Sequence, residues 1–253
     1  MLKLATGLNH AIQHDQLILC YQPQFNLVSG ELVGVEALVR WRHPARGLML
    51  PDEFIPLAEK TGLIVTLGEW VLRRACQQYQ EWTQRGLSLP RIAVNIASRQ
   101  LEEENVVQMV MGVLAETGMP PERLEIELTE TGRSLSPDAL QKLIYLRSQG
   151  IEIALDDFGV GCSSLWAIKF VPLTRIKLAQ LYIEGIGNNL TDESIVRMVI
   201  DLAHSLGLRV IAEGVDTLEK KQFLQTHRCH EVQGFYFSMP LTGDEVFTLF
   251  FGK

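Results

Sequence analysis

The chain has 253 residues, of which 47% are hydrophobic and 21% charged, and its formal net charge is −7. This composition is typical of a globular chain and excludes a mostly disordered one. The negative charge disfavours binding of duplex nucleic acid through a basic face, and no run of about 20 apolar residues exists to span a bilayer. We expect one domain, because about 250 residues fit a single α/β barrel.

The cysteines are too far apart in the sequence for a disulfide framework or a cysteine zinc site. Cys20, Cys76, Cys162 and Cys229 form no C-x-x-C pair. The N-terminus soon becomes polar and holds no apolar segment of the kind found in signal peptides. We therefore expect a protein of the reducing cytoplasm.

The predicted elements begin with a helix within residues 1–16, which we interpret as the possible remnant of a connection to an upstream module. Short apolar runs rich in β-branched residues then predict eight strands. These strands are expected at residues 17–21, 32–39, 92–96, 124–128, 151–155, 175–178, 209–212 and 231–235.

Amphipathic stretches between most of these runs predict helices. One runs towards Trp82, one begins after Ser136 with Pro137 in its first turn, and one is capped by Thr191 or Asp192. Glycine follows several of them directly before the next strand, as expected at helix C-termini: Gly86, Gly118, Gly150 and Gly207. Strands that alternate with helices over this length favour a β/α barrel, and a doubly wound open sheet is the alternative.

Polar side chains recur at the carboxyl ends of the predicted strands. They are Glu36, Asn95, Glu127, Glu130, Asp156, Asp157, Lys177, Glu213 and Gln233. In a β/α barrel these ends converge on one face, where active sites are built. Asn95 alternates with Val94 and Ile96, so its side chain should point into the barrel.

The acids among these residues require a positive counterpart. Six carboxylates face one lysine, and crowded carboxylates repel one another in a partly buried pocket. Oxygen ligands favour Mg²⁺ or Mn²⁺, and an adjacent pair of aspartates with further acids can hold two cations about 3.5–4 Å apart. The sequence therefore predicts a site for two divalent cations.

Simpler interpretations apply to several polar residues taken singly. A lone acid at a strand end is usually a helix cap or a solvated loop charge, and only the recurrence over several strands favours a site. Glu125 shares the face of Glu127, and we favour an ion pair inside the barrel over a ligand role. Residues 227–230 (HRCH) precede the last strand and are interpreted as a loop, and the DFG at 157–159 lacks the other kinase elements.

The motifs resemble those of the EAL-domain family, the bacterial cyclic-di-GMP-specific phosphodiesterases, from about residue 17 to residue 240. The matching segments are YQP (21–23), EALVRWRHP (36–44), FIPLAE (54–59), VNI (94–96), ELTE (127–130), DDFG (156–159), AEGV (212–215) and QGFYFS (233–238). The resemblance implies a single EAL domain over residues 1–253. It also implies a modified TIM-type (β/α)8 barrel in which one strand is reversed.

The resemblance also implies a role for each matching residue. Two cations, Mg²⁺ or Mn²⁺, would be held by Glu36, Asn95, Glu127, Asp156 and Asp157. Lys177 and Glu213 would position or deprotonate the attacking water, so that Glu36, Asp156, Lys177 and Glu213 form the catalytic set. The dinucleotide would contact Gln22, Arg40, Asp157 and Gln233, and Glu130 would brace the loop after the fifth strand.

These roles imply hydrolysis of cyclic-di-GMP to linear pGpG. The chain departs from the family at Ala179, which replaces an aspartate, and at Val160 and Cys162, which replace a hydroxyl and an aromatic residue. These departures are the support for the alternative, a catalytically weak or inactive receptor for cyclic-di-GMP. Because no metal-binding or water-positioning residue is altered, we expect an active cyclic-di-GMP phosphodiesterase. A barrel enzyme of sugar or enolate chemistry is a third possibility.

A homodimer and upstream sensory or GGDEF-type modules are further expectations from the resemblance.

Overall fold

The strands close into an eight-stranded barrel, which confirms the predicted α/β barrel and excludes the open sheet. The computed structural model describes residues 2–129, 135–161 and 164–251. The barrel strands are β1 (Leu17–Asn26), β2 (Leu32–His43), β4 (Ile92–Ile96), β5 (Leu124–Thr129), β6 (Glu152–Phe158), β7 (Arg175–Leu178), β8 (Arg209–Ala212) and β9 (Glu231–Val232). The barrel closes because β1 pairs with both β2 and β9. A short strand missed by the sequence patterns, β3 (Gly47–Met49), pairs antiparallel with the end of β2.

One barrel strand is reversed, as the family resemblance implied. β1 is antiparallel to β2 and to β9, whereas the other barrel pairs are parallel. A tight turn causes the reversal, because two strands joined by a few residues can only pair antiparallel. The Asn26 side chain accepts hydrogen bonds from the amides of Val28 and Ser29, and Gly30 supplies a φ of 71°.

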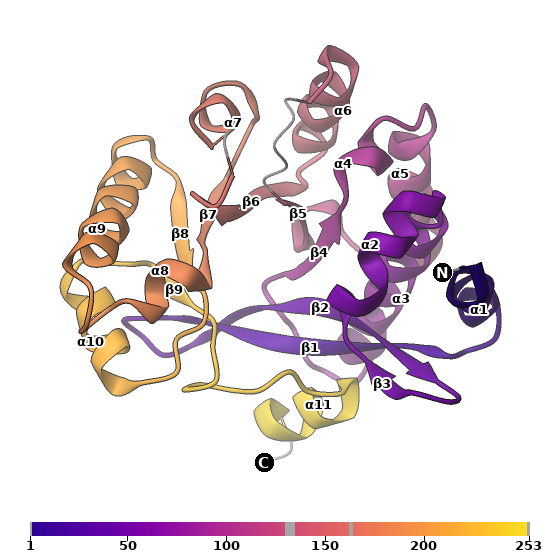
Figure 1. The fold of residues 1–253 in the computed structure, drawn as a ribbon, viewed down its shortest axis with the longest axis horizontal. Coiled ribbons are helices and arrows are strands. Elements are labelled where there is room, and N and C mark those ends of the chain that lie inside the picture. Colours follow the sequence, from indigo (N-terminus) through magenta and orange to yellow (C-terminus); the bar gives the residue numbers. More distant parts are fainter. Residues whose placement is uncertain (1, 130–134, 162–163, 252–253) are drawn as a thin grey trace.

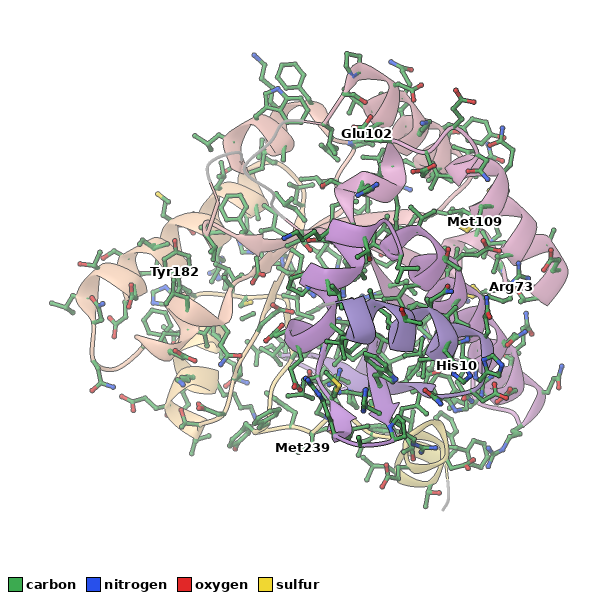
Figure 2. The ribbon with its side chains drawn as sticks, turned by 45° about the vertical axis from the view of Figure 1, so that its right-hand side comes forward. His10, Arg73, Glu102, Met109, Tyr182 and Met239 are labelled. Atoms are coloured by element: carbon green, nitrogen blue, oxygen red, sulfur yellow. The ribbon has the colours of Figure 1, made fainter. Side chains whose placement is uncertain are left out.

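Helices surround the barrel (Figure 1). They are α1 (Leu2–Gln13), α2 (Pro51–Thr61), α3 (Ile64–Gln84), α4 (Ser98–Leu101), α5 (Val106–Thr117), α6 (Pro137–Ser148), α7 (Ser164–Phe170), α8 (Gln180–Glu184), α9 (Leu190–Ser205), α10 (Leu218–Thr226) and α11 (Gly243–Phe251), with a 3-10 turn at Pro121–Arg123. Figure 2 shows Arg73 of α3 and Met109 of α5 on the opposite side of the molecule from Tyr182 of α8. Within the described ranges, no helix is both long and apolar enough to cross a membrane.

The helix ends agree with the sequence signals, with one exception. Ser136 caps α6 by accepting a hydrogen bond from the Ala139 amide at 3.1 Å. The four glycines predicted to end helices all have positive φ. The predicted start of α9 at Thr191 or Asp192 is wrong, because Asn189 accepts hydrogen bonds from the amides of both residues and caps the helix earlier.

The predicted loop at residues 227–230 is confirmed, because these residues lie between α10 and β9. His227 ends α10, and the HRCH segment leads into β9. Cys20, Cys76 and Cys229 are free thiols, whereas Cys162 lies outside the described residues.

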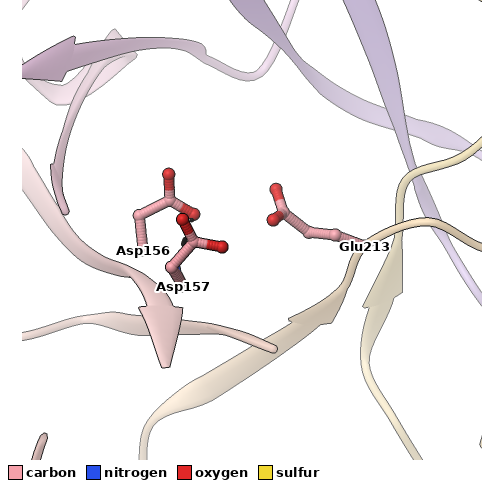
Figure 3. Close-up of side chains that lie close together, drawn as sticks. All are labelled: Asp156, Asp157 and Glu213. Atoms are coloured by element: carbon pink, nitrogen blue, oxygen red, sulfur yellow. Dashed lines mark hydrogen bonds between the residues drawn. The ribbon is translucent and has the colours of Figure 1, made fainter. Parts of the chain in front are cut away.

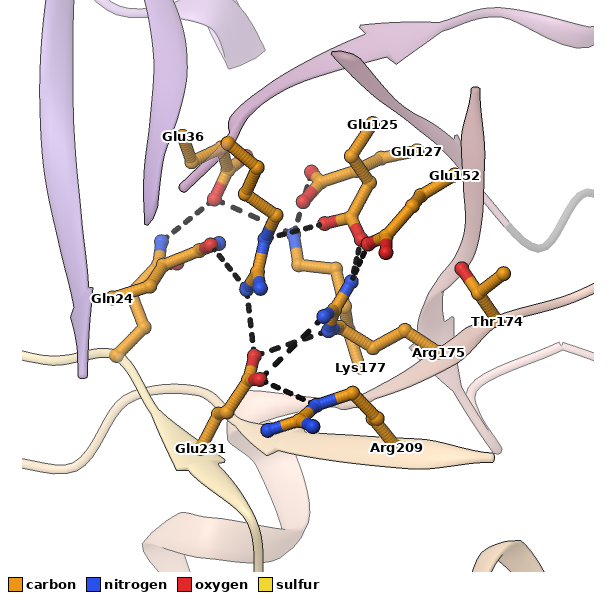
Figure 4. A network of polar contacts seen from close by, with 12 residues as sticks. Gln24, Glu36, Glu125, Glu127, Glu152, Thr174, Arg175, Lys177, Arg209 and Glu231 are labelled. Atoms are coloured by element: carbon orange, nitrogen blue, oxygen red, sulfur yellow. Dashed lines mark hydrogen bonds and ion pairs between the residues drawn. The ribbon is translucent and has the colours of Figure 1, made fainter. Parts of the chain in front are cut away.

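A layer of ion pairs fills the end of the barrel where the parallel strands begin, and we call it the lower layer (Figure 4). It comprises Gln24, Arg91, Glu125, Glu152, Arg175, Arg209 and Glu231. Glu125 is fully buried and pairs with Arg91 and Arg175, so the predicted ion-pair role is confirmed. The alternate residues of the same strand, Ile126 and Leu128, belong to the hydrophobic core.

Glu231 is the centre of the lower layer. It is 1% exposed and pairs with Arg91 at 2.6 Å, with Arg175 at 3.1 Å and with Arg209 at 2.7 Å. Burial disfavours its charged form, but the arginines outweigh burial and lower the pKa of Glu231 to about 2. Because the folded-state pKa lies below the unfolded value, Glu231 stabilises the fold above pH 4.5, and this contribution declines as the pH falls towards 2.

Replacing Glu231 by glutamine tests this contribution. We expect Glu231→Gln to lower the free energy of unfolding by about 3 kcal/mol at pH 7, because the buried arginines lose their carboxylate. The difference from the wild type should shrink by about 1 kcal/mol at pH 3.5, since the wild-type contribution is then partly lost. Urea denaturation at both pH values measures it. The exposed Glu104→Gln is the control, and a pH-independent difference would contradict the assignment.

Candidate active site

A second polar layer, which we call the upper layer, lies two residues further along the parallel strands. Glu127 follows Glu125 on β5, Lys177 follows Arg175 on β7, and Gln233 follows Glu231 after β9. Residues two apart on a strand share a face, so both layers point into the barrel. On the reversed β1 the order is inverted, and Gln22 belongs to the upper layer while Gln24 belongs to the lower one.

Lys177 is the centre of the upper layer. Its side chain is 1% exposed, and its Nζ lies 2.7 Å from Glu127, 2.8 Å from Glu213, 3.0 Å from Asp156 and 3.4 Å from Glu36. These carboxylates come from β2, β5, β6 and the end of β8, so a single ammonium group contacts side chains from widely separated strands of the barrel. Figure 4 shows Lys177 between Glu36 and Glu127.

Burial and the crowding of carboxylates around Lys177 shift the pKa values of these groups. Burial opposes the charge on Lys177, but the surrounding carboxylates prevail and raise its pKa well above the usual value. Burial raises the pKa of Glu213 to about 8, with Lys177 opposing and Asp156 adding to the rise. Burial and Glu36 likewise raise the pKa of Glu127. The site therefore binds protons more readily than isolated carboxylates would.

Side-chain amides hold Glu36 in place. Asn95 donates to Glu36 at 2.8 Å and to Glu127 at 3.3 Å, so it points into the barrel as predicted. Gln233 donates to the other Glu36 oxygen at 2.6 Å and to Gln22 at 3.0 Å. Burial opposes the charge on Glu36, but Lys177 and these amide donors outweigh it and lower the pKa of Glu36.

A β-bulge brings the adjacent aspartates together. In the pairing of β6 with β7, Leu155 faces Ile176 and Phe158 faces Leu178, so Asp156 and Asp157 both stand opposite one residue. Consecutive strand residues normally point to opposite faces, and the extra residue of a bulge re-aims one of them. Asp157 adopts a φ of 52°, and oxygens of Asp156, Asp157 and Glu213 lie within 4.8 Å of one another. Figure 3 shows the aspartates facing Glu213.

The upper layer fits divalent cations. Its carboxylates, Glu36, Glu127, Asp156, Asp157 and Glu213, outnumber Lys177 five to one. Among the described residues, the buried Oε1 of Glu127 finds no hydrogen-bond partner. The donors are carboxylate and amide oxygens, the ligands that Mg²⁺ and Mn²⁺ prefer.

A groove of about 630 Å³ leads to the upper layer. It runs along one face of β2, past Glu36, Leu38 and Arg40, and it is also lined by Gln22 and Gln233. The Arg40 guanidinium donates to the carbonyl of Val39 at 2.9 Å. Further lining residues stand in the first turn of a helix or in a loop, where no periodic pattern marks a site, and were not singled out from the sequence: Asp52, Gln180, Gly214, Asp216 and Phe235.

The structure thus brings most predicted site residues to one mouth of the barrel. The upper layer and its rim contain Glu36, Asn95, Glu127, Asp156, Asp157, Lys177, Glu213 and Gln233. Gln22 and Arg40 line the adjoining groove. Glu130 lies outside the described residues.

The fold and the site identify the chain as a barrel domain with an acidic mouth whose side chains fit divalent cations. The family model of the EAL domain matches residues 6–240. The chain therefore belongs to the EAL domain family.

Curated relatives share its sequence over nearly its whole length. The bifunctional diguanylate cyclase/cyclic di-GMP phosphodiesterase MucR of Pseudomonas aeruginosa is 38% identical over 246 residues, which are 97% of this chain and 36% of the relative. The cyclic di-GMP phosphodiesterase NbdA of the same organism is 40% identical over 241 residues, which are 95% of this chain and 31% of the relative. The chain spans about a third of the length of these relatives.

Solved structures agree with this assignment. The PaMucR phosphodiesterase in complex with c-di-GMP superposes with a TM-score of 0.91 at 37% identity, covering 96% of this chain and 99% of that chain. The EAL enzyme Bd1971, in a form with cAMP and cyclic-di-GMP bound, gives a TM-score of 0.92 at 27% identity and covers 98% of this chain and 68% of that chain.

Removing the central ammonium group tests the electrostatics of the upper layer. With chelator present at pH 8, we expect Lys177→Met to lower the free energy of unfolding by about 3–5 kcal/mol, because buried carboxylates lose their counter-charge. The loss should be smaller at pH 6. Groups with a raised pKa, such as Glu213 at about 8, take up protons as the pH falls and relieve the repulsion.

Urea denaturation at pH 8 and pH 6 measures this effect. The exposed Lys60→Met, on α2, serves as the control. A stability loss of equal size at both pH values would show that packing of the lysine, and not its charge, accounts for the effect.

Proposed function

We propose that this domain hydrolyses cyclic-di-GMP to linear pGpG with the aid of two divalent cations, Mg²⁺ or Mn²⁺. The observation that carries the proposal is the excess of carboxylates over lysine at the end of a groove of about 630 Å³. Cations attracted by these carboxylates would in turn attract the phosphodiester of a dinucleotide. The names of the relatives MucR and NbdA support the substrate and the reaction.

The upper layer offers ligands for both cations. Glu36, Asn95, Glu127 and Asp156 would hold the first, and Asp156 and Asp157 the second. When bound, such cations lower the pKa of a water molecule and neutralise charge on phosphoryl oxygens.

Lys177 and Glu213 have separate tasks in this proposal. The Lys177 ammonium stays charged in the buried layer and balances negative charge that develops on the phosphate. Glu213 keeps one oxygen at 2.8 Å from Lys177 and can take the proton of the attacking water on the other. A pKa of about 8 suits a group that must take up and release a proton near neutral pH.

The groove would hold the rest of the dinucleotide. Arg40 lies two strand positions beyond Leu38 and four beyond Glu36 on the same face of β2. Its planar guanidinium can form two hydrogen bonds to a phosphate that lies over this strand. Gln22, Asp157 and Gln233 complete the proposed substrate contacts.

A receptor without catalysis is the second candidate, and the departures from the family pattern favour it. Ala179 is buried at the start of α8 and carries no polar group, and Val160 is 57% exposed. A receptor would bind cyclic-di-GMP and release no product.

Product analysis separates the two candidates. Incubation with cyclic-di-GMP and Mn²⁺ should yield pGpG on chromatography, and excess chelator should stop its formation. Glu36→Ala should lower kcat at least about 100-fold, because one cation loses a ligand. The exposed Glu31→Ala is the control. Unchanged turnover in Glu36→Ala would refute the metal assignment, and binding of cyclic-di-GMP without pGpG would favour the receptor.

The resemblance further implies a homodimer and upstream sensory or GGDEF-type modules, and the cysteine pattern implies the cytoplasm. These remain predictions. Light scattering of the purified domain tests the dimer.

A further inference from the structure

The turn that follows β6 is held in an unusual conformation. Asp157, within the bulge, has a φ of 52°, a region that residues other than glycine seldom adopt. Gly159, two residues later, has a φ of 94°. Such conformations persist only where the surrounding structure enforces them.

Two hydrogen bonds within the segment contribute to this conformation. The Asp157 amide donates to Oδ1 of Asp156 at 3.0 Å, and the Val160 amide donates to the carbonyl of Asp157 at 3.2 Å. Both bonds lie within five residues and define the shape of the segment. Strand pairing of Asp156 with β5 and of Phe158 with β7 holds its first residues in the barrel, but among the described residues no strand pairing extends to the turn at Gly159.

A contact from α8 ties the turn to the rest of the fold. The hydroxyl of Tyr182 donates to the carbonyl of Gly159 at 2.6 Å. The Tyr182 ring also leaves no room for a side chain at this position, because a Cβ built on Gly159 would lie 2.9 Å from the Tyr182 Cε2 atom. Figure 2 labels Tyr182 on its helix.

The other end of this contact is firmly placed. Tyr182 lies only five residues after Lys177, on a helix that begins directly after β7, and its ring packs against the hydrophobic core. The Tyr182 amide also donates to the carbonyl of Ala179 at 3.2 Å. Tyr182 therefore connects the turn to a helix that directly follows the strand of Lys177.

We propose that Tyr182 is a positioning residue that holds Asp157 in place for the second cation. The inference rests on the proposed function and concerns one side chain of its site. Val160 is exposed and has no hydroxyl, and Ala179 has no polar group, so neither side chain can make a polar tie between the turn and α8. The Tyr182 hydroxyl supplies that tie.

Removing only the hydroxyl tests the proposal. Tyr182→Phe keeps the packed ring and should weaken Mn²⁺ binding about fivefold in calorimetry without nucleotide, the size expected for one hydrogen bond. The Mn²⁺ concentration that gives half-maximal hydrolysis should rise by the same factor. Saturating Mn²⁺ should restore kcat to within about twofold, because no ligand or proton-transfer group is lost.

The controls separate positioning from general damage. Tyr145→Phe, at an exposed tyrosine of α6, should leave both Mn²⁺ measurements unchanged. Tyr182→Leu also removes the hydroxyl, without altering the backbone of the turn, and should also weaken Mn²⁺ binding. Circular dichroism checks folding, and if Tyr182→Phe does not fold, Tyr182→Leu decides.

Each outcome bears on one proposal at a time. Wild-type Mn²⁺ affinity in Tyr182→Phe would overturn the positioning role and leave the proposed hydrolysis intact. A kcat that stays low at saturating Mn²⁺ would also overturn it, because the hydroxyl would then serve another step. If the wild type binds Mn²⁺ but releases no pGpG, the proposed function fails, while the calorimetric comparison still decides the role of Tyr182.

Discussion

A single buried ammonium group among four carboxylates is the interaction on which this barrel depends. The two polar layers differ in how their charges balance. In the lower layer, Arg91, Arg175 and Arg209 match Glu125, Glu152 and Glu231 in number. In the upper layer Lys177 is outnumbered by the acids around it. The charges of the lower layer are therefore balanced, whereas the upper layer has an excess of carboxylates, and this difference is why we propose that the active site lies at the upper end of the barrel.

The period-two pattern explains why much of this could be predicted from the sequence. The predicted bounds of the third, sixth and seventh strands agree with β4, β7 and β8, because these strands are short apolar runs with clear ends. Once the barrel is assumed, residues at the carboxyl ends of parallel strands must meet, which is why Glu127, Lys177 and Glu213 could be grouped without coordinates. The reversed strand came from the family resemblance, although the turn residues Asn26 and Gly30 indicate a hairpin.

The remaining features depend on contacts that no local pattern encodes. Arg91 directly precedes β4 and follows a proline, so in the sequence it looks like a solvated loop charge. Only the folded barrel shows that it pairs with Glu125 and Glu231. The left-handed backbone of Asp157 arises from a mismatch between β6 and β7, which only their pairing reveals. The start of α9 could not be predicted from local sequence either. Asn189, Thr191 and Asp192 are all residue types that cap helices, and only the structure shows that Asn189 does so.

The hairpin between β1 and β2 has a consequence for access to the chemistry. Its turn lies beside His230 at the lower-layer end of the barrel, since the Leu27 amide donates to the His230 carbonyl at 3.0 Å. A regular barrel would instead send a strand-to-helix loop over the opposite rim at this position. At this rim the groove that leads to the upper layer runs along β2 and is lined also by Leu50, Pro51 and Asp52, at the start of α2, and by Gln233, Gly234 and Phe235.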